Sequence, residues 1–137
     1  MREILFRAKR LYDGEWIEGL LWKKKYNSNK LFISYFPNED DEEACFAVDP
    51  ETVGQFTGLT DKNGVKIWDG DICNCVYDGI LATRIIVWDE DELDFKGTNG
   101  KKNYNGNFNY LPCCEEVKVI GNIFDNPELL KGGGTDG

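Results

Sequence analysis

Apolar and polar side chains alternate along short stretches of the chain, and turn-forming residues separate the stretches. This two-residue period is that of a strand with one buried face, and Ile, Val, Phe, Tyr and Trp, which suit a pleated surface, are frequent in it. No window holds a helical apolar repeat over several turns. The pattern predicts strands over residues 3–12, 16–22, 31–36, 44–48, 65–68, 71–77, 80–88, 108–111 and 117–124.

Turn signals lie between the predicted strands. Asp13-Gly14, Asn63-Gly64, Asp69-Gly70 and Asp78-Gly79 flank apolar or aromatic runs, and these residue types accept the positive φ angles of tight hairpins. The sequence therefore predicts a mostly β protein, a small antiparallel β-barrel or meander that follows an N-terminal β meander.

Two single-turn helices are also predicted. At 49–52 and at 126–130, a capping Asp or Asn precedes Pro at the first helical position, and a Glu follows in the first turn. The stretch 96–107, rich in Gly, Asn and Lys, is predicted to be a long mobile loop.

Length sets the expected domain organisation. A chain of 137 residues is of ordinary single-domain size, so we expect one domain over 1–131, with 1–48 and 49–131 as the alternative division into subdomains. Residues 132–137 are predicted to form a flexible C-terminal tail, because they carry nothing to bury.

The apolar runs and the cysteines indicate a compartment. No apolar stretch is long enough to cross a bilayer, and charges interrupt the N-terminus where a signal peptide has its apolar centre. The odd count of five cysteines and the adjacent Cys113-Cys114 argue against a disulfide framework. We therefore expect a cytoplasmic protein with reduced thiols.

The net charge of −9 is unevenly spread. Residues 1–35 carry eight basic and four acidic side chains, a balance of +4, whereas residues 36–94 carry three basic and sixteen acidic ones, a balance of −13. The acidic runs at 39–43 and 89–94 are predicted to be solvated loops. Such a field repels nucleic acid, so direct binding is disfavoured, although Lys23-Lys24-Lys25 keeps that alternative open.

Candidate chemistry is sparse. The chain has no histidine, which excludes Ser-His-Asp and Cys-His machinery and the usual general base at neutral pH. Four thiols could ligate zinc in principle, but paired CxxC knuckles are missing and small buried hydrophobic roles are favoured for Cys73, Cys75, Cys113 and Cys114.

The neighbouring carboxylates of Asp69 and Asp71 would suit acid–base catalysis or Mg²⁺, yet they lie in a turn that enters a strand, where Asp commonly accepts hydrogen bonds from the backbone. A structural role is favoured. We expect no enzyme, no metal and no cofactor.

Three segments carry a family resemblance. Residues 1–8 read MREILFRA, residues 53–72 read VGQFTGLTDKNGVKIWDGDI, and residues 119–130 read VIGNIFDNPELL. In this order they closely resemble the YopX family of phage and prophage proteins, and they bracket nearly the whole chain.

The resemblance implies a mostly β protein with no established biochemical activity. It also implies structural roles for the signature residues, which supply turns, tie them or cap the last helical turn: Gly58, Asp61, Gly64, Gly70, Asp71, Gly121, Asn126 and Pro127. The Gly-Asp-Ile element at 70–72 resembles the entry to the first strand of small SH3-like barrels, an analogy that would place such an element at 65–124.

These observations favour a non-enzymatic phage or prophage accessory protein in the cytoplasm of the bacterial host. It would act by self-assembly into a homo-oligomer or by binding a host or phage protein, since many strands imply sheet edges that need covering. Two alternatives stay open: an acidic nucleic-acid mimic that binds a host DNA-binding protein, and a direct nucleic-acid binder that uses Lys23-Lys24-Lys25.

Overall fold

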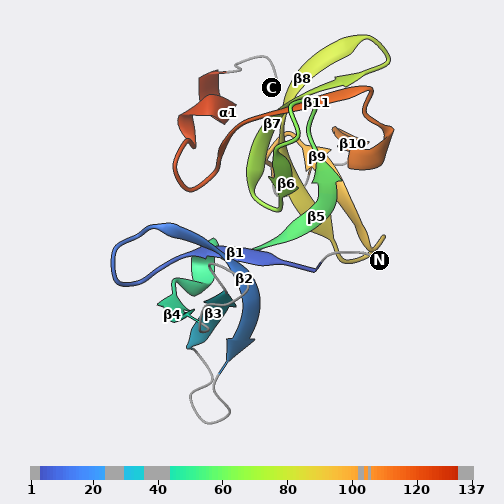
Figure 1. Cartoon of the computed structure of the whole chain (residues 1–137). Coiled ribbons are helices and arrows are strands. Elements are labelled where there is room, and N and C mark those ends of the chain that lie inside the picture. The colour runs from blue at the N-terminus through green and yellow to red at the C-terminus, as the bar shows by residue number, and fades with distance from the viewer. Residues whose placement is uncertain (1–3, 24–29, 36–43, 102–103, 105, 133–137) are drawn as a thin grey trace. The chain divides into compact units, whose positions relative to one another are not determined.

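The computed structural model describes residues 4–23, 30–35, 44–101, 104 and 106–132. Contacts divide the chain into two compact units, Met1–Phe56 and Thr57–Gly137 (Figure 1). Each unit contains a buried apolar cluster of its own. The tail predicted at 132–137 lies outside the described residues except for Gly132, the last residue of helix α1 (Glu128–Gly132).

The first unit is an antiparallel meander, as predicted. Its consecutive strands are β1 (Phe6–Lys9), β2 (Trp16–Lys23), β3 (Leu31–Tyr35) and β4 (Ala44–Val48). Alternate side chains on one face form its core, in which Ala8, Ile33 and Val48 are buried. The other face carries Trp16, Leu20 and Trp22 along β2.

Strand β2 serves two neighbours because of a glycine at its centre. Its first half pairs with β1, where Gly19 lies opposite Phe6, and its second half pairs with β3 from Leu20 onward. A Cβ at position 19 would collide with the carbonyl oxygen of Ser34. Glycine is therefore required for this close approach.

A short helix leads from the meander into a strand that was not predicted. The helical turn expected at 49–52 is confirmed as η1 (Pro50–Thr52), and the Asp49 carboxylate accepts the Glu51 N–H at 3.1 Å. Strand β5 (Gly54–Thr60) then pairs with β1 through Gly54 and Gln55. It continues into the second unit, where β6 (Lys66–Trp68) is its neighbour.

The second unit contains a five-stranded antiparallel sheet in the order β10-β9-β8-β7-β11. Its strands are β7 (Asp71–Tyr77), β8 (Ile80–Asp89), β9 (Asp94–Thr98), β10 (Phe108–Tyr110) and β11 (Glu116–Asn122). A short helix, η2 (Leu111–Cys113), lies between β10 and β11 in the chain. One face of the sheet forms the core, which contains Ile67, Cys73, Cys75, Ile86, Phe95, Leu111 and Val117.

The predicted fold class is confirmed as mostly β and antiparallel, but over the described residues the sheets do not close into a barrel. The second predicted helical turn is confirmed as α1. The loop predicted at 96–107 was wrong at its start, because β9 continues to Thr98. The SH3-like element at 65–124 stays an analogy. Among the described residues, no helix is long and apolar enough to span a membrane.

Candidate functional site

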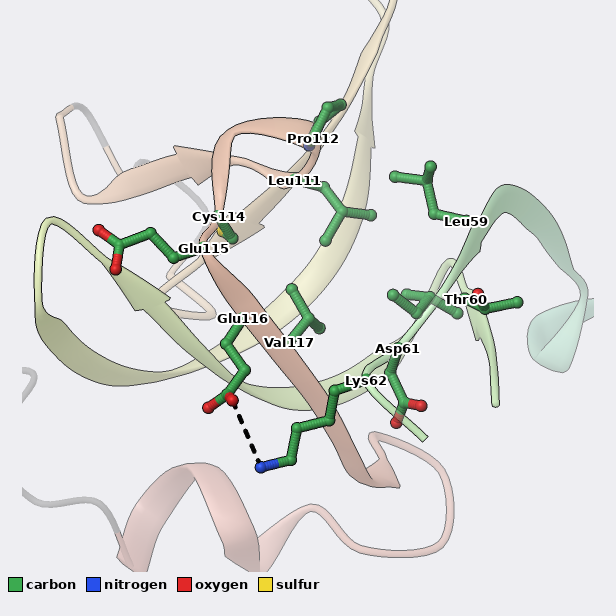
Figure 2. Close-up of a pocket in the computed structure, with 11 residues that line it drawn as sticks. Leu59, Thr60, Asp61, Lys62, Leu111, Pro112, Cys114, Glu115, Glu116 and Val117 are labelled. Carbon is green, nitrogen blue, oxygen red and sulfur yellow. Dashed lines mark ion pairs between the residues drawn. The ribbon is translucent and has the colours of Figure 1, made fainter. Parts of the chain in front are cut away.

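A groove of about 420 Å³, lined by apolar and polar side chains, opens in the second unit (Figure 2). Leu59 on β5 and Leu111 on η2 face each other across it, and Val117 on β11 lies below them. Its remaining lining comes from these elements, from the residues directly after β5 and η2, and from β6: Thr60, Asp61, Lys62, Ile67, Pro112, Cys114, Glu115 and Glu116. This volume is in the range of natural ligand pockets.

A turn after β5 fixes the base of this groove. The Asp61 carboxylate accepts the backbone N–H groups of Asn63 at 2.8 Å and Val65 at 3.0 Å, which shapes the turn. Its other oxygen accepts the N–H of Val119 in β11 at 2.9 Å, and the N–H of Lys62 donates to the carbonyl oxygen of Val117 at 3.0 Å. The turn therefore ties β5 to β11, and the groove lies between the two segments (Figure 2).

The negative charge of Asp61 strengthens the backbone hydrogen bonds that hold this turn. Burial opposes ionisation, but the N–H groups of Val119, Val65 and Asn63 outweigh it and lower the pKa of the carboxyl group. A carboxylate that accepts three backbone hydrogen bonds is held in place and has little capacity left for a substrate.

The other charged groups at the groove have partners as well. The Lys62 ammonium lies 3.6 Å from the Glu116 carboxylate, and both side chains are about half exposed (Figure 2). The Glu115 carboxylate accepts the N–H of Gly79, at the tip of the β7–β8 hairpin, at 3.2 Å. The rim is thus polar and acidic, and apolar side chains line the interior.

The cysteines do not gather as a set of four. Cys73 and Cys75 are buried on the inner face of β7, Cys114 packs against their cluster, and Cys113 is exposed. The hydrogen bond between the Cys75 and Cys114 side chains, together with burial, raises the pKa of Cys75, and the same bond lowers the pKa of Cys114. Within the described residues, no three Cys, Asp or Glu side chains are grouped to hold a metal ion.

The glycines of the family signature lie at positions that demand glycine. Gly58, Gly64 and Gly70 have φ angles of 88°, 80° and 93°. Gly121 has a different reason, because a Cβ there would lie 2.6 Å from the Asn126 side-chain oxygen and 2.8 Å from Leu129.

The polar signature residues act on the backbone. The Asp71 carboxylate, 2% exposed, accepts the Trp68 N–H at 2.8 Å, and Asp69 lies in the turn between them. The Asn126 side-chain oxygen accepts the Asn122 N–H at 3.3 Å, and the carbonyl oxygen of Pro127 accepts the Leu130 N–H at 3.3 Å where α1 starts. The structure therefore brings only Asp61 of this set to the groove.

Sequence reasoning missed a second cluster, the Lys96 cage, which consists of Asp89, Glu92, Lys96, Tyr104, Phe108 and Tyr110. The Lys96 ammonium lies 2.7 Å from the Asp89 carboxylate and 2.5 Å from the Glu92 carboxylate. Three aromatic rings surround it, with centroids 4.1 to 5.8 Å away. The hydroxyl groups of Tyr104 and Tyr110 donate to the same two carboxylates.

The structure describes only some of the charged segments singled out in the sequence. The acidic run at 89–94 forms the turn between β8 and β9, where two of its carboxylates belong to the Lys96 cage. The run at 39–43, and Lys24 and Lys25, lie outside the described residues. Lys23 is exposed at the end of β2.

Two of three comparisons with known proteins find a match. The family model described as YopX protein matches residues 5–131. The crystal structure of protein EF1440 from Enterococcus faecalis is similar over 95% of this chain and 99% of that chain, with 24% identity and a TM-score of 0.50. At this identity the likeness shows the fold alone. No curated protein sequence matches significantly.

Proposed function

The chain belongs to the YopX family, and from this premise we propose that it is a non-enzymatic accessory protein of a phage or prophage. It acts in the host cytoplasm by holding a segment of another protein in the groove of its second unit. Family membership supports the phage setting, and the groove supports the mode of action.

One observation carries the proposal: the groove contains the apolar side chains of Leu59, Leu111 and Val117, and each charged side chain that lines it has a structural partner. Asp61 holds backbone N–H groups, Lys62 pairs with Glu116, and Glu115 accepts the Gly79 N–H. Catalysis needs a titratable group directed at a substrate, whereas binding needs apolar area and a polar rim. The groove offers the second combination.

The chemistry of the groove specifies its occupant. Leu59 is 38% exposed at the groove, so it offers apolar area that a partner can cover. Residues 57–137 carry fourteen acidic and eight basic side chains, a balance of −6, and two of those acids, Glu115 and Glu116, lie at the rim. The occupant is therefore an apolar side chain of a partner protein with a basic residue beside it.

A peptide selection tests this proposal. Peptides selected from a random library on the immobilised protein are expected to combine an apolar anchor with Lys or Arg. Their affinity is then measured by titration calorimetry for the wild type and for Leu59→Asn. We expect the variant to lose roughly tenfold in affinity, because it puts an amide where the anchor packs.

Leu93→Asn is the matched control, because Leu93 is 71% exposed in the β8–β9 turn and is not among the groove residues. Its φ angle of 54° suits Asn, so the fold should tolerate the change. Selection of acidic peptides, or equal affinity for wild type and Leu59→Asn, would contradict the proposal. So would turnover of a substrate that depends on a groove residue.

A further inference from the structure

The first unit exposes an apolar patch with a lysine beside it, called here the β2–β3 patch: Leu20, Trp22, Lys30 and Phe32. Trp22 lies opposite Phe32 in the strand register, and their rings stack with centroids 4.5 Å apart. Leu20 is 58% exposed and Trp22 39%, although the Trp22 indole N–H donates to Ser34 Oγ at 2.9 Å. Lys30 is exposed just before β3, whereas Lys23, opposite Leu31, lies on the other face of the sheet.

The second unit exposes an apolar projection flanked by acids, the β7–β8 tip: Tyr77, Asp78, Ile80, Leu81 and Glu115. Ile80 is 69% exposed and Leu81 64%. Asp78 and Gly79 form the turn, both at positive φ, and the Gly79 N–H is held by the Glu115 carboxylate. The tip is therefore a shaped hairpin end whose large apolar side chains face solvent.

We propose that the β7–β8 tip of one copy docks on the β2–β3 patch of a second copy. Apolar groups meet on both sides, and Lys30 of the patch faces the Asp78 and Glu115 carboxylates of the tip. This complementarity is what commits the inference to a second copy of this chain, because the chain itself carries both halves of the contact. A patch that met another patch would oppose lysine with lysine.

The contact joins two different surfaces, so it is heterologous. An open assembly keeps one free patch at one end and one free tip at the other unless it closes into a ring. The contact shares only Glu115 with the groove. The assembly would repeat the groove at each copy and raise the avidity for a partner with several binding segments.

Mixing two defective variants tests the contact. The patch variant is Leu20→Thr with Lys30→Glu, and the tip variant is Ile80→Thr with Leu81→Thr; Thr suits exposed strand positions. By sedimentation, the wild type should show concentration-dependent association that weakens with salt, and each variant alone should associate at least tenfold more weakly. The 1:1 mixture should form dimers and nothing larger, because each variant retains the surface that the other has lost.

Ile4→Thr with Leu11→Thr is the matched control, because these two side chains are 58% and 62% exposed and belong to neither surface. It should associate as the wild type does, and circular dichroism of all variants reports whether the fold is kept. A monomeric wild type at high concentration, variants that associate normally, or a mixture that stays monomeric would each overturn the proposal.

Discussion

Two clusters of the molecule combine aromatic rings with lysine, yet they differ in what the lysine contacts. In the Lys96 cage the lysine is 2% exposed and is held by two carboxylates and three rings. In the β2–β3 patch the rings of Trp22 and Phe32 stack on each other, and Lys30 is exposed. Similar residue types thus form a structural element in one unit and a surface open to a partner in the other.

The difference is that the ammonium of Lys96 has anionic partners within the chain. The hydrogen bonds to Asp89 and Glu92 raise the pKa of Lys96, and the bond from Lys96 lowers the pKa of both carboxyl groups. A cation with two anionic partners at this distance is unavailable to a ligand. A cluster of aromatic residues and lysine is therefore a candidate binding surface only where its apolar area and its charge remain exposed.

The largest expected effect follows from emptying the cage. Lys96→Met leaves the two carboxylates close together without their cation, so we expect the Tm to fall by roughly 10 °C. Differential scanning calorimetry measures it. Lys101→Met is the matched control, because Lys101 is exposed in the segment after β9, and its Tm should stay within about 2 °C of the wild type. If the Tm fell equally for Lys96→Met and Lys101→Met, the cage would not stabilise the fold more than an exposed lysine does, and the contrast with the patch would be lost.

The cage also predicts a pH dependence. Asp89 and Glu92 have lowered pKa values, so their contribution is present above their unfolded values, near pH 4, and is lost as the pH falls through the lower folded values. Lys96 has a raised pKa, so its contribution is present below its unfolded value of about 10.4 and is lost at higher pH.

The Tm difference between wild type and Lys96→Met should therefore be constant between about pH 5 and 9 and should narrow below about pH 4. Thermal unfolding in a buffer series measures this. A difference that persists undiminished at the acid end would mean that the lysine stem, which packs among the rings, stabilises the fold more than the ion pairs do.

The sequence predicted strands best where apolar alternation and a turn signal coincide. The β7–β8 hairpin was predicted at 71–77 and 80–88 because Asp78-Gly79 separates two alternating runs, and the observed strands differ by one residue. Strand β5 was missed because Gly54 and Gly58 interrupt its pattern, and its pairing with β1 spans distant parts of the sequence. Tertiary pairing decided its structure, not local propensity.

Strand β9 was missed for a related reason. The stretch 96–107 was predicted to be a loop because it is rich in Gly, Asn and Lys, and that composition hid the buried role of Lys96. Its partners are in the acidic run at 89–94, which was predicted to be solvated. The available signal was the close spacing of those acids before a lysine and three aromatic residues. That spacing does not predict which of these side chains contact one another.

The groove was beyond reach of the sequence. Asp61 was identified as a turn residue through the family resemblance, but its bond to Val119, 58 residues away, is what joins β5 to β11. Leu59 and Leu111 look like ordinary strand residues in the sequence and become groove residues only through that connection. No local pattern contains such a contact.

The smallest expected effects on stability concern the patch, and they test its half of the comparison with the Lys96 cage. Trp22→Ala removes one ring of a stacked cross-strand pair that is partly exposed, so we expect a loss of about 1–2 kcal/mol in the free energy of unfolding. Lys23→Met and Lys30→Met should each change it by less than about 0.5 kcal/mol, because both lysines are exposed. Urea unfolding at low protein concentration, where copies do not associate, measures all three. If Lys30 proved as important to the fold as Lys96, the patch would be a second cage and its cation would already be bound within the chain.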